Sequence, residues 1–155
     1  MILDCGNGCN GLAAALFKAV HAGIVVVCAD TKKITSINPA ACIMIGVRSE
    51  EVIGKECGEY LCTENCDGCP VMTASLEDGI EDVDNKEIVI YRKDGSKVYA
   101  LLTISSIVLD DKRMFINSLT DITRLKEAEK KLEESWGQAE KMLSENVIHL
   151  KNGVT

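Results

Sequence analysis

Apolar and polar residues repeat with two different periods along the chain, and each change of period marks a new element. Residues 10–22 carry apolar side chains at helical spacing, whereas β-branched runs and alternating patterns predict strands. The predicted strands cover residues 24–28, 34–37, 87–91, 97–109 and 114–119. Alternation in the fourth strand groups five residues on one face, namely Tyr99, Leu101, Thr103, Ser105 and Ile107. Two strands, a block of short helices and three further strands predict one antiparallel sheet covered on one face by helices, an α+β fold.

Short helices are predicted between the second and third strands. Pro39 stands at a first helical position with Asn38 available as its cap, and Gly46 ends this helix. A short turn opens at Ser49, and another helix is predicted over residues 70–77. The later strands are joined by the hairpin turns 93–96 and 110–112; the first contains a glycine that accepts positive φ.

A long helix is predicted from Ile122 to about Leu150. Its a and d positions are Leu125, Ala128, Leu132, Ala139 and Met142, and the apolar stripe is widened by Trp136, Leu143 and Leu150. This pattern favours a parallel homodimeric coiled coil, and packing of the helix on its own domain is the alternative. The predicted organisation is therefore a tail over 1–11, a domain over 12–121 and a coiled-coil output helix over 122–155.

Charge and hydropathy exclude two classes of partner. The net charge of −7 and the interleaving of basic with acidic residues leave no strip for nucleic acid. Residues 11–29 are rich in Ala and Val, but Lys18 and His21 interrupt them, which argues against a membrane span. The chain starts without the basic region of a signal peptide, so a cytoplasmic location is expected.

The eight cysteines are unevenly distributed. Four of them form a Cys-x4-Cys-x3-Cys-x2-Cys-Pro segment, namely Cys57, Cys62, Cys66 and Cys69. Clustered thiols in a cytosolic protein favour metal or redox chemistry, and thiolates select zinc or iron–sulfur clusters. The nearly continuous spacing followed by Pro70 favours an iron–sulfur cluster. Zinc, a thiol–disulfide switch and no chemistry are the alternatives.

The other four cysteines have simpler interpretations. Cys5 and Cys9 lie in a Gly-rich N-terminal segment, where a frayed end is expected. Cys28 and Cys42 fall within apolar elements, and filling of the core is expected for both.

Several short motifs occur together in a characteristic order. They are Ala22-Gly23-Ile24-Val25-Val26, Ile37-Asn38-Pro39-Ala40-Ala41, Glu51-Val52-Ile53-Gly54-Lys55, Arg92-Lys93-Asp94-Gly95-Ser96 and Leu119-Thr120-Asp121-Ile122-Thr123. In this order they resemble a PAS domain over roughly residues 12–123. The resemblance implies a five-stranded sheet with a pocket beneath its helices, sensing of a ligand, cofactor or redox state, and dimeric signalling. It also implies that Asp121 and Thr123 couple the last strand to the output helix; helix capping is the compatible alternative.

Two cofactors common among PAS domains are not expected here. Gly54-Lys55-Glu56-Cys57 resembles the photoadduct segment of flavin-binding light sensors, but the residues that follow lack the Arg and Gln of those proteins. Ile90 and Ala100 also replace the Asn that contacts the flavin, so a flavin edge would be left without polar partners. Haem needs an axial ligand, and neither His21 nor His149 is placed for that role.

No catalytic constellation is recognisable. Val147-Ile148-His149-Leu150 lacks the acidic neighbour of a phospho-accepting histidine, and no Gly-rich phosphate loop follows. The sequence therefore predicts a non-enzymatic sensor module that detects redox state or a small ligand, with the output domain of a parent protein as its downstream partner. An iron–sulfur electron-transfer protein and a ligand-free dimerisation module are the alternatives.

Overall fold

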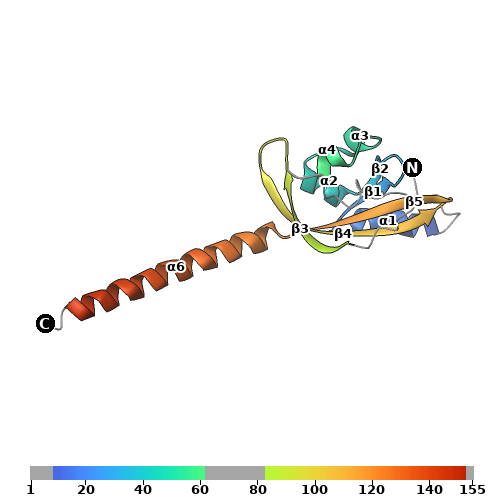
Figure 1. Ribbon diagram of the computed structural model, residues 1–155. Helices are drawn as coiled ribbons and strands as arrows, with labels where there is room; N and C mark the ends of the chain where they lie inside the picture. Colours follow the sequence, from blue (N-terminus) through green and yellow to red (C-terminus); the bar gives the residue numbers. More distant parts are fainter. Residues whose placement is uncertain (1–8, 62–82, 153–155) are drawn as a thin grey trace. The chain divides into compact units, whose positions relative to one another are not determined.

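Five antiparallel strands form a single sheet in the order β2-β1-β5-β4-β3 (Figure 1). The computed structural model describes residues 9–61 and 83–152. The strands are β1 (Gly23–Cys28), β2 (Ile34–Ile37), β3 (Val83–Tyr91), β4 (Lys97–Leu109) and β5 (Lys112–Asp121). The helices are α1 (Cys9–Ala19), α2 (Pro39–Ile45), α3 (Ser49–Val52), α4 (Gly58–Leu61) and α6 (Thr123–Asn152). The predicted α+β fold is confirmed.

The chain divides into two compact units, Met1–Ile122 and Thr123–Thr155. The first unit holds the sheet and the short helices, and the second consists of α6. The predicted boundary fell between residues 121 and 122, one residue before this division.

Side chains alternate between the two faces of each strand, and only one face belongs to the core. In β4 the buried side chains are Val98, Ala100, Leu102 and Ile104. The side chains that the alternating pattern grouped together, from Tyr99 to Ile107, lie on the face of β4 opposite the core. β1 and β5 lie in the middle of the sheet, with Val25 opposite Asn117 and Val27 opposite Phe115. Their inward side chains therefore form the centre of the core.

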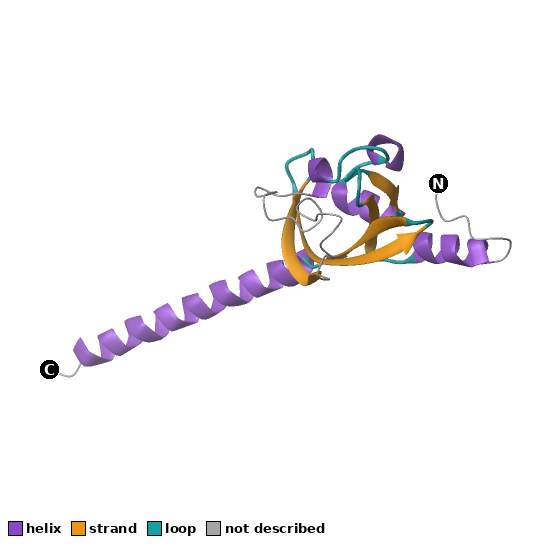
Figure 2. Ribbon diagram, turned by 45° about the vertical axis from the view of Figure 1, so that its right-hand side comes forward, coloured by secondary structure: helices purple, strands orange, loops and turns teal. Residues whose placement is uncertain are grey.

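The short helices pack on the inward face of the sheet, α2 against β1 and β3 and α3 against β2 (Figure 2). The contact between α2 and β1 is close at Gly23. A Cβ atom at Gly23 would lie 3.0 Å from the Cα of Ala41 and 3.1 Å from its Cβ. The first residue of β1 must therefore be very small for α2 to approach the sheet.

The predicted ends of α2 are confirmed. Asn38 is the N-cap, and its side-chain oxygen accepts a hydrogen bond from the Ala41 N–H at 3.0 Å. Gly46 closes the helix with a φ of +77°, a left-handed conformation that glycine adopts without a Cβ penalty.

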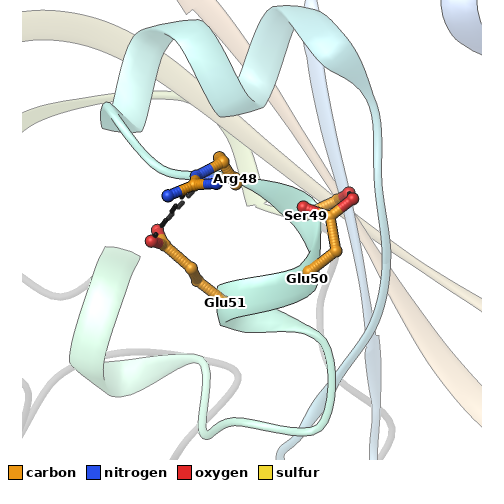
Figure 3. A network of polar contacts seen from close by, with 4 residues as sticks. All are labelled: Arg48, Ser49, Glu50 and Glu51. Atoms are coloured by element: carbon orange, nitrogen blue, oxygen red, sulfur yellow. Dashed lines mark hydrogen bonds and ion pairs between the residues drawn. The ribbon is translucent and has the colours of Figure 1, made fainter.

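The start of α3 is stabilised by a local polar network (Figure 3). The Glu51 carboxylate accepts a hydrogen bond from the Arg48 N–H at 3.2 Å and lies 3.8 Å from the Arg48 guanidinium. The Ser49 hydroxyl donates to Glu50 at 3.2 Å. These residues are exposed or half-buried, so the network orders a short helix and contributes little to global stability.

The third strand is longer than predicted. β3 begins at Val83, four residues before the predicted start, with an irregularity between Val83 and Lys86 where Asn85 has a φ of +50°. The two hairpin turns match their predictions, with positive φ at Gly95 in one and at Asp110 and Asp111 in the other. The helix predicted over 70–77 lies outside the described residues.

The second unit is a single helix of 30 residues. Its large apolar side chains are exposed, among them Leu125, Leu132, Trp136, Met142, Leu143 and Val147. Leu125 and Leu132 are seven residues apart, as are Trp136 and Leu143, which is the heptad spacing. Over the described part of the chain, no helix has both the length and the apolar character needed to cross a membrane.

Candidate functional site

The inward face of the sheet and the helices above it enclose an interior that is almost entirely apolar. Its fully buried side chains include Val25, Val27, Ile90, Ile104, Phe115 and Leu119. Among the described residues, only Asn38 and Asn117 are buried polar residues. A buried amide is costly unless its groups are hydrogen-bonded, so these two side chains have specific roles.

Asn117 lies in the middle of β5, on the same face as Phe115 and Leu119. Only 1% of its surface is exposed, and its Nδ2 donates to the carbonyl oxygen of Val25 at 3.3 Å. Its pairing partner on the adjacent strand β4 is Ile104, which is also buried. The Asn117 side chain thus places a hydrogen-bonded amide among apolar groups in the centre of the core.

Asn38 has a different role, because its side chain takes part in four hydrogen bonds. Its Oδ1 accepts from the N–H groups of Ile24 at 2.8 Å and Ala41 at 3.0 Å. Its Nδ2 donates to the carbonyl oxygens of Ala22 at 2.9 Å and Phe17 at 3.1 Å. This one side chain therefore joins α1, the start of β1 and the start of α2.

Of the four predicted metal ligands, only Cys57 is described. Its thiol belongs to the core, with 1% of the residue exposed, and its N–H donates to the carbonyl oxygen of Lys32 at 2.9 Å. Cys62, Cys66 and Cys69 lie outside the described residues. Within residues 9–61 and 83–152, no three His, Cys, Asp or Glu side chains are grouped as metal ligands would be. The metal site remains a prediction.

The two predicted coupling residues lie where the sheet ends and the long helix begins. Asp121 is the last residue of β5 and pairs with Ala100 of β4. The N–H of Ile122 donates to the carbonyl oxygen of Tyr99 at 2.8 Å, and Thr123 is the first residue of α6. The last residues of the strand are thus fixed to the sheet immediately before the helix.

The two half-buried cysteines differ from each other, and only one of them matches its prediction. Cys42 packs against the core, as predicted, and burial raises the pKa of its thiol, with a further contribution from the Glu50 carboxylate. The prediction was wrong for Cys28, which is half-buried on the face of β1 opposite the core because inward side chains alternate with outward ones. Burial raises the pKa of the Cys28 thiol, but hydrogen bonds from Thr31 and the Asp30 backbone outweigh it, so the pKa is lowered.

The positions considered for other cofactors are also defined. Ile90 and Ala100 are buried in the core, so the interior is aliphatic at both positions. His21 is exposed, and its Nδ1 lies 3.2 Å from the carbonyl oxygen of Ala19. The side chain of His149 is not described.

Sequence reasoning missed Asn117 and recognised Asn38 only as a helix cap. The available signal for Asn117 was its place between Phe115 and Leu119 in an alternating strand, where a polar residue at an inward position is unusual. The additional partners of Asn38 had no signal in the sequence, because they belong to residues 14 to 21 positions away.

Comparisons with known proteins agree with this geometry. A family model described as PAS domain matches residues 21–124. The PAS domain of an HTR-like protein from Haloarcula marismortui is similar with a TM-score of 0.61 and 22% identity, over 74% of this chain and 92% of that one. The PAS domain of nitrogen regulation protein NR(II) from Vibrio parahaemolyticus gives 0.60 and 16%, over 72% and 98%. An RNA-binding light-oxygen-voltage receptor gives 0.65 and 18%, over 88% of this chain and 41% of that one.

Proposed function

Because the chain belongs to the PAS domain family, we propose that it is the sensory module of a signal-transduction protein and relays redox state or a bound small ligand through a dimeric α6. PAS domains are sensory and signalling domains, and they are typically non-catalytic modules. The proposed module has no catalytic machinery of its own and acts on the output domain of a parent protein.

The observation that carries this proposal is the course of β5. This strand passes through the centre of the sheet with Phe115, Asn117 and Leu119 buried, and the chain enters α6 two residues after Asp121. A shift of β5 caused by a change in the interior would therefore reach the first turn of α6 through three residues of main chain. Asp121 and Thr123 are the proposed coupling residues, because they flank this junction.

The proposed signal is detected in the interior or by the four-cysteine segment. Asn117 supports sensing in the interior, since it is a buried polar side chain among the apolar residues of the core. The buried position of Cys57 supports coupling of the cysteine segment to the core, because chemistry at this thiol would act on residues packed around it. We propose Cys57, Cys62, Cys66 and Cys69 as ligands of an iron–sulfur cluster, with zinc as the alternative metal. The aliphatic surroundings of Ile90 and Ala100 argue against flavin.

The metal proposal is tested by anaerobic purification followed by iron, zinc and acid-labile sulfide analysis and a visible spectrum. Iron with sulfide and a broad absorption band, both lost on serine substitution of Cys62, Cys66 or Cys69, would support a cluster. Stoichiometric zinc in a colourless protein would support a structural site. Serine substitution of Cys42 serves as the control. If neither iron nor zinc is found, a thiol switch or the apolar interior is the sensing element.

Dimerisation through α6, on which the proposed relay depends, is tested by sedimentation at micromolar concentration. The apolar stripe of α6 contains Leu132, and its substitution by Glu should convert a dimer into a monomer. Lys130→Glu places the same side chain on the opposite face of the helix and should leave the dimer intact. A monomeric unsubstituted chain, or a dimer that survives Leu132→Glu, would contradict dimerisation through α6.

Two other functions are separated by the same measurements. A cluster that is reduced reversibly without any change in helix packing would favour an electron-transfer protein. A metal-free dimer whose assembly responds to no ligand or oxidant would favour a plain dimerisation module.

A further inference from the structure

Three segments that are distant in the sequence surround a hollow of about 570 Å³ at one end of the sheet. The turn between β1 and β2 contributes Cys28, Thr31 and Lys33. The segment after α3 contributes Ile53 and Gly54, and the β4–β5 hairpin contributes Leu109, Asp110, Lys112 and Met114. A volume of this size accommodates a small organic molecule. One core residue, Ile34, also lines the hollow.

The charged groups of the hollow favour an anionic ligand. Two lysines, Lys33 and Lys112, line it and are exposed, whereas Asp110 is its single acidic lining residue. Ammonium groups near an apolar surface attract carboxylates, and their flexible stems adapt to ligands of different shape. The ligand therefore carries negative charge together with an apolar or sulfur-containing part.

Cys28 places a nucleophile in the same hollow. Hydrogen bonds from the Thr31 N–H and hydroxyl and from the Asp30 backbone lower the pKa of its thiol, although burial and the Asp30 carboxylate oppose the shift. The thiolate is the reactive form of cysteine, and the half-buried Cys28 lines the hollow, where an incoming molecule can reach it. Lys33, Lys112 and Asp110 line the same hollow as this thiol, and the Asp30 carboxylate is the charge that acts on its pKa.

Cys42 provides a comparison within the same molecule. It lines another hollow, of about 450 Å³, between α1 and the start of α3. Burial and the nearby Glu50 carboxylate raise the pKa of this thiol. The surroundings of these two half-buried cysteines therefore shift their thiol pKa values in opposite directions.

We propose that the hollow around Cys28 is an S-thiolation site, where Cys28 forms a mixed disulfide with a small anionic thiol supplied as its disulfide. The Cys28 thiolate attacks one sulfur of the incoming disulfide, the sulfur–sulfur bond breaks, and the other half leaves as a thiolate that takes a proton from water. The incoming disulfide is the oxidant, and Lys33 and Lys112 hold its carboxylates. This proposal depends neither on metal binding by the four-cysteine segment nor on dimerisation through α6.

The test uses the full chain, reduced and then incubated with glutathione disulfide, followed by trapping of free thiols and peptide mass spectrometry at successive times. Cys28 should gain the glutathionyl group at least about tenfold faster than Cys42. Cys28→Ser should abolish modification at this peptide, and Cys42→Ser should leave the Cys28 rate unchanged. Equal rates at the two cysteines, or an unmodified Cys28, would overturn the proposal.

Anion selectivity is tested with a second disulfide and a second variant. Cystamine, which is cationic, should modify Cys28 more slowly than glutathione disulfide does. The double variant Lys33→Gln, Lys112→Gln should lower the glutathione rate severalfold and bring it closer to the cystamine rate, with circular dichroism confirming its fold. A variant that reacts as fast as the unsubstituted chain would overturn the role of the lysines. Because metal content is measured separately, failure here is distinguishable from failure of the proposed function.

Discussion

The Nε of Arg92, the residue that follows β3, donates to the carbonyl oxygen of Met44 in the last turn of α2 at 2.9 Å. A second nitrogen of the same guanidinium lies 3.2 Å from the carbonyl oxygen of Ile43. These carbonyls have no partner within the helix, and the positive charge also complements the negative end of the helix dipole. Arg92 therefore fastens α2 to the strand that it covers.

Arg92→Ala is expected to lower the free energy of unfolding by about 1–3 kcal/mol, because two helix carbonyls lose a charged donor. Arg92→Lys keeps the charge but not the forked geometry, so its loss should be smaller but measurable. Chemical denaturation of both variants tests this order. Lys93→Ala, at an exposed neighbouring position, is the control, and an equal loss in it would refute the assignment.

Asn38→Ala is expected to destabilise the domain by about 3 kcal/mol, because the substitution removes a helix cap and leaves buried main-chain groups without partners. Asn38→Asp preserves the two acceptor contacts to Ile24 and Ala41 but loses the donors to Phe17 and Ala22. Urea unfolding should therefore show a loss for Asn38→Asp as well, because a buried carboxylate cannot donate to those two carbonyl oxygens. If Asn38→Ala unfolds at the same urea concentration as the unsubstituted chain, the linking role is wrong.

Gly23→Ala is expected to cost about 1–3 kcal/mol, because the added methyl group would lie 3.0 Å from the Ala41 Cα and α2 would have to move. Gly137→Ala in α6 is the matched control, since an added Cβ there meets nothing within 4 Å. That substitution should increase helix stability by about 1 kcal/mol. Thermal unfolding measures the stability lost in Gly23→Ala, and helix content measures the stability gained in Gly137→Ala. The two changes in stability should have opposite signs.

The Asp94 carboxylate in the β3–β4 turn accepts hydrogen bonds from the Ser96 hydroxyl at 2.6 Å and the Ser96 N–H at 2.8 Å. These bonds lower the pKa of Asp94. A lowered folded-state pKa stabilises the turn at pH values above the unfolded pKa of about 4, and this contribution disappears as pH falls through the folded value.

Ser96→Ala should move the pKa of Asp94 back toward its usual value, whereas Ser96→Thr should keep it low because the hydroxyl is retained. An NMR titration of the Asp94 carboxyl carbon measures both. An identical titration in the alanine variant and the unsubstituted chain would show that the hydroxyl contributes nothing.

Much of the fold follows from signals that are local in the sequence. The cap at Asn38, the glycine end of α2 and the turns at Gly95 and Asp110 depend on the conformational preferences of single residues. The alternation in β4 correctly grouped Tyr99 with Ile107 on one face, because successive strand residues always point to opposite sides. It did not say which face belongs to the core.

The early start of β3 and the position of Cys28 were not predicted. Lys86 and Glu87 are polar and exposed, so the first half of β3 carries no apolar pattern; hydrogen bonding to β4 defines it instead. Cys28 ends an apolar run in which every residue resembles a core residue. Only the pairing of β1 with β5 establishes which of those side chains point outward.

The order of the strands, the turns that join the later ones, the family and the amphipathic stripe of α6 follow from the sequence, because these features arise from residues close together in the chain. Tertiary structure alone decided that Arg92 caps a helix 48 residues away, that Asn117 is buried and that Cys28 shares a hollow with Lys33 and Lys112. Such relationships depend on which distant segments the sheet brings together. Their burial and charge environment follow from that packing, so no local pattern encodes them.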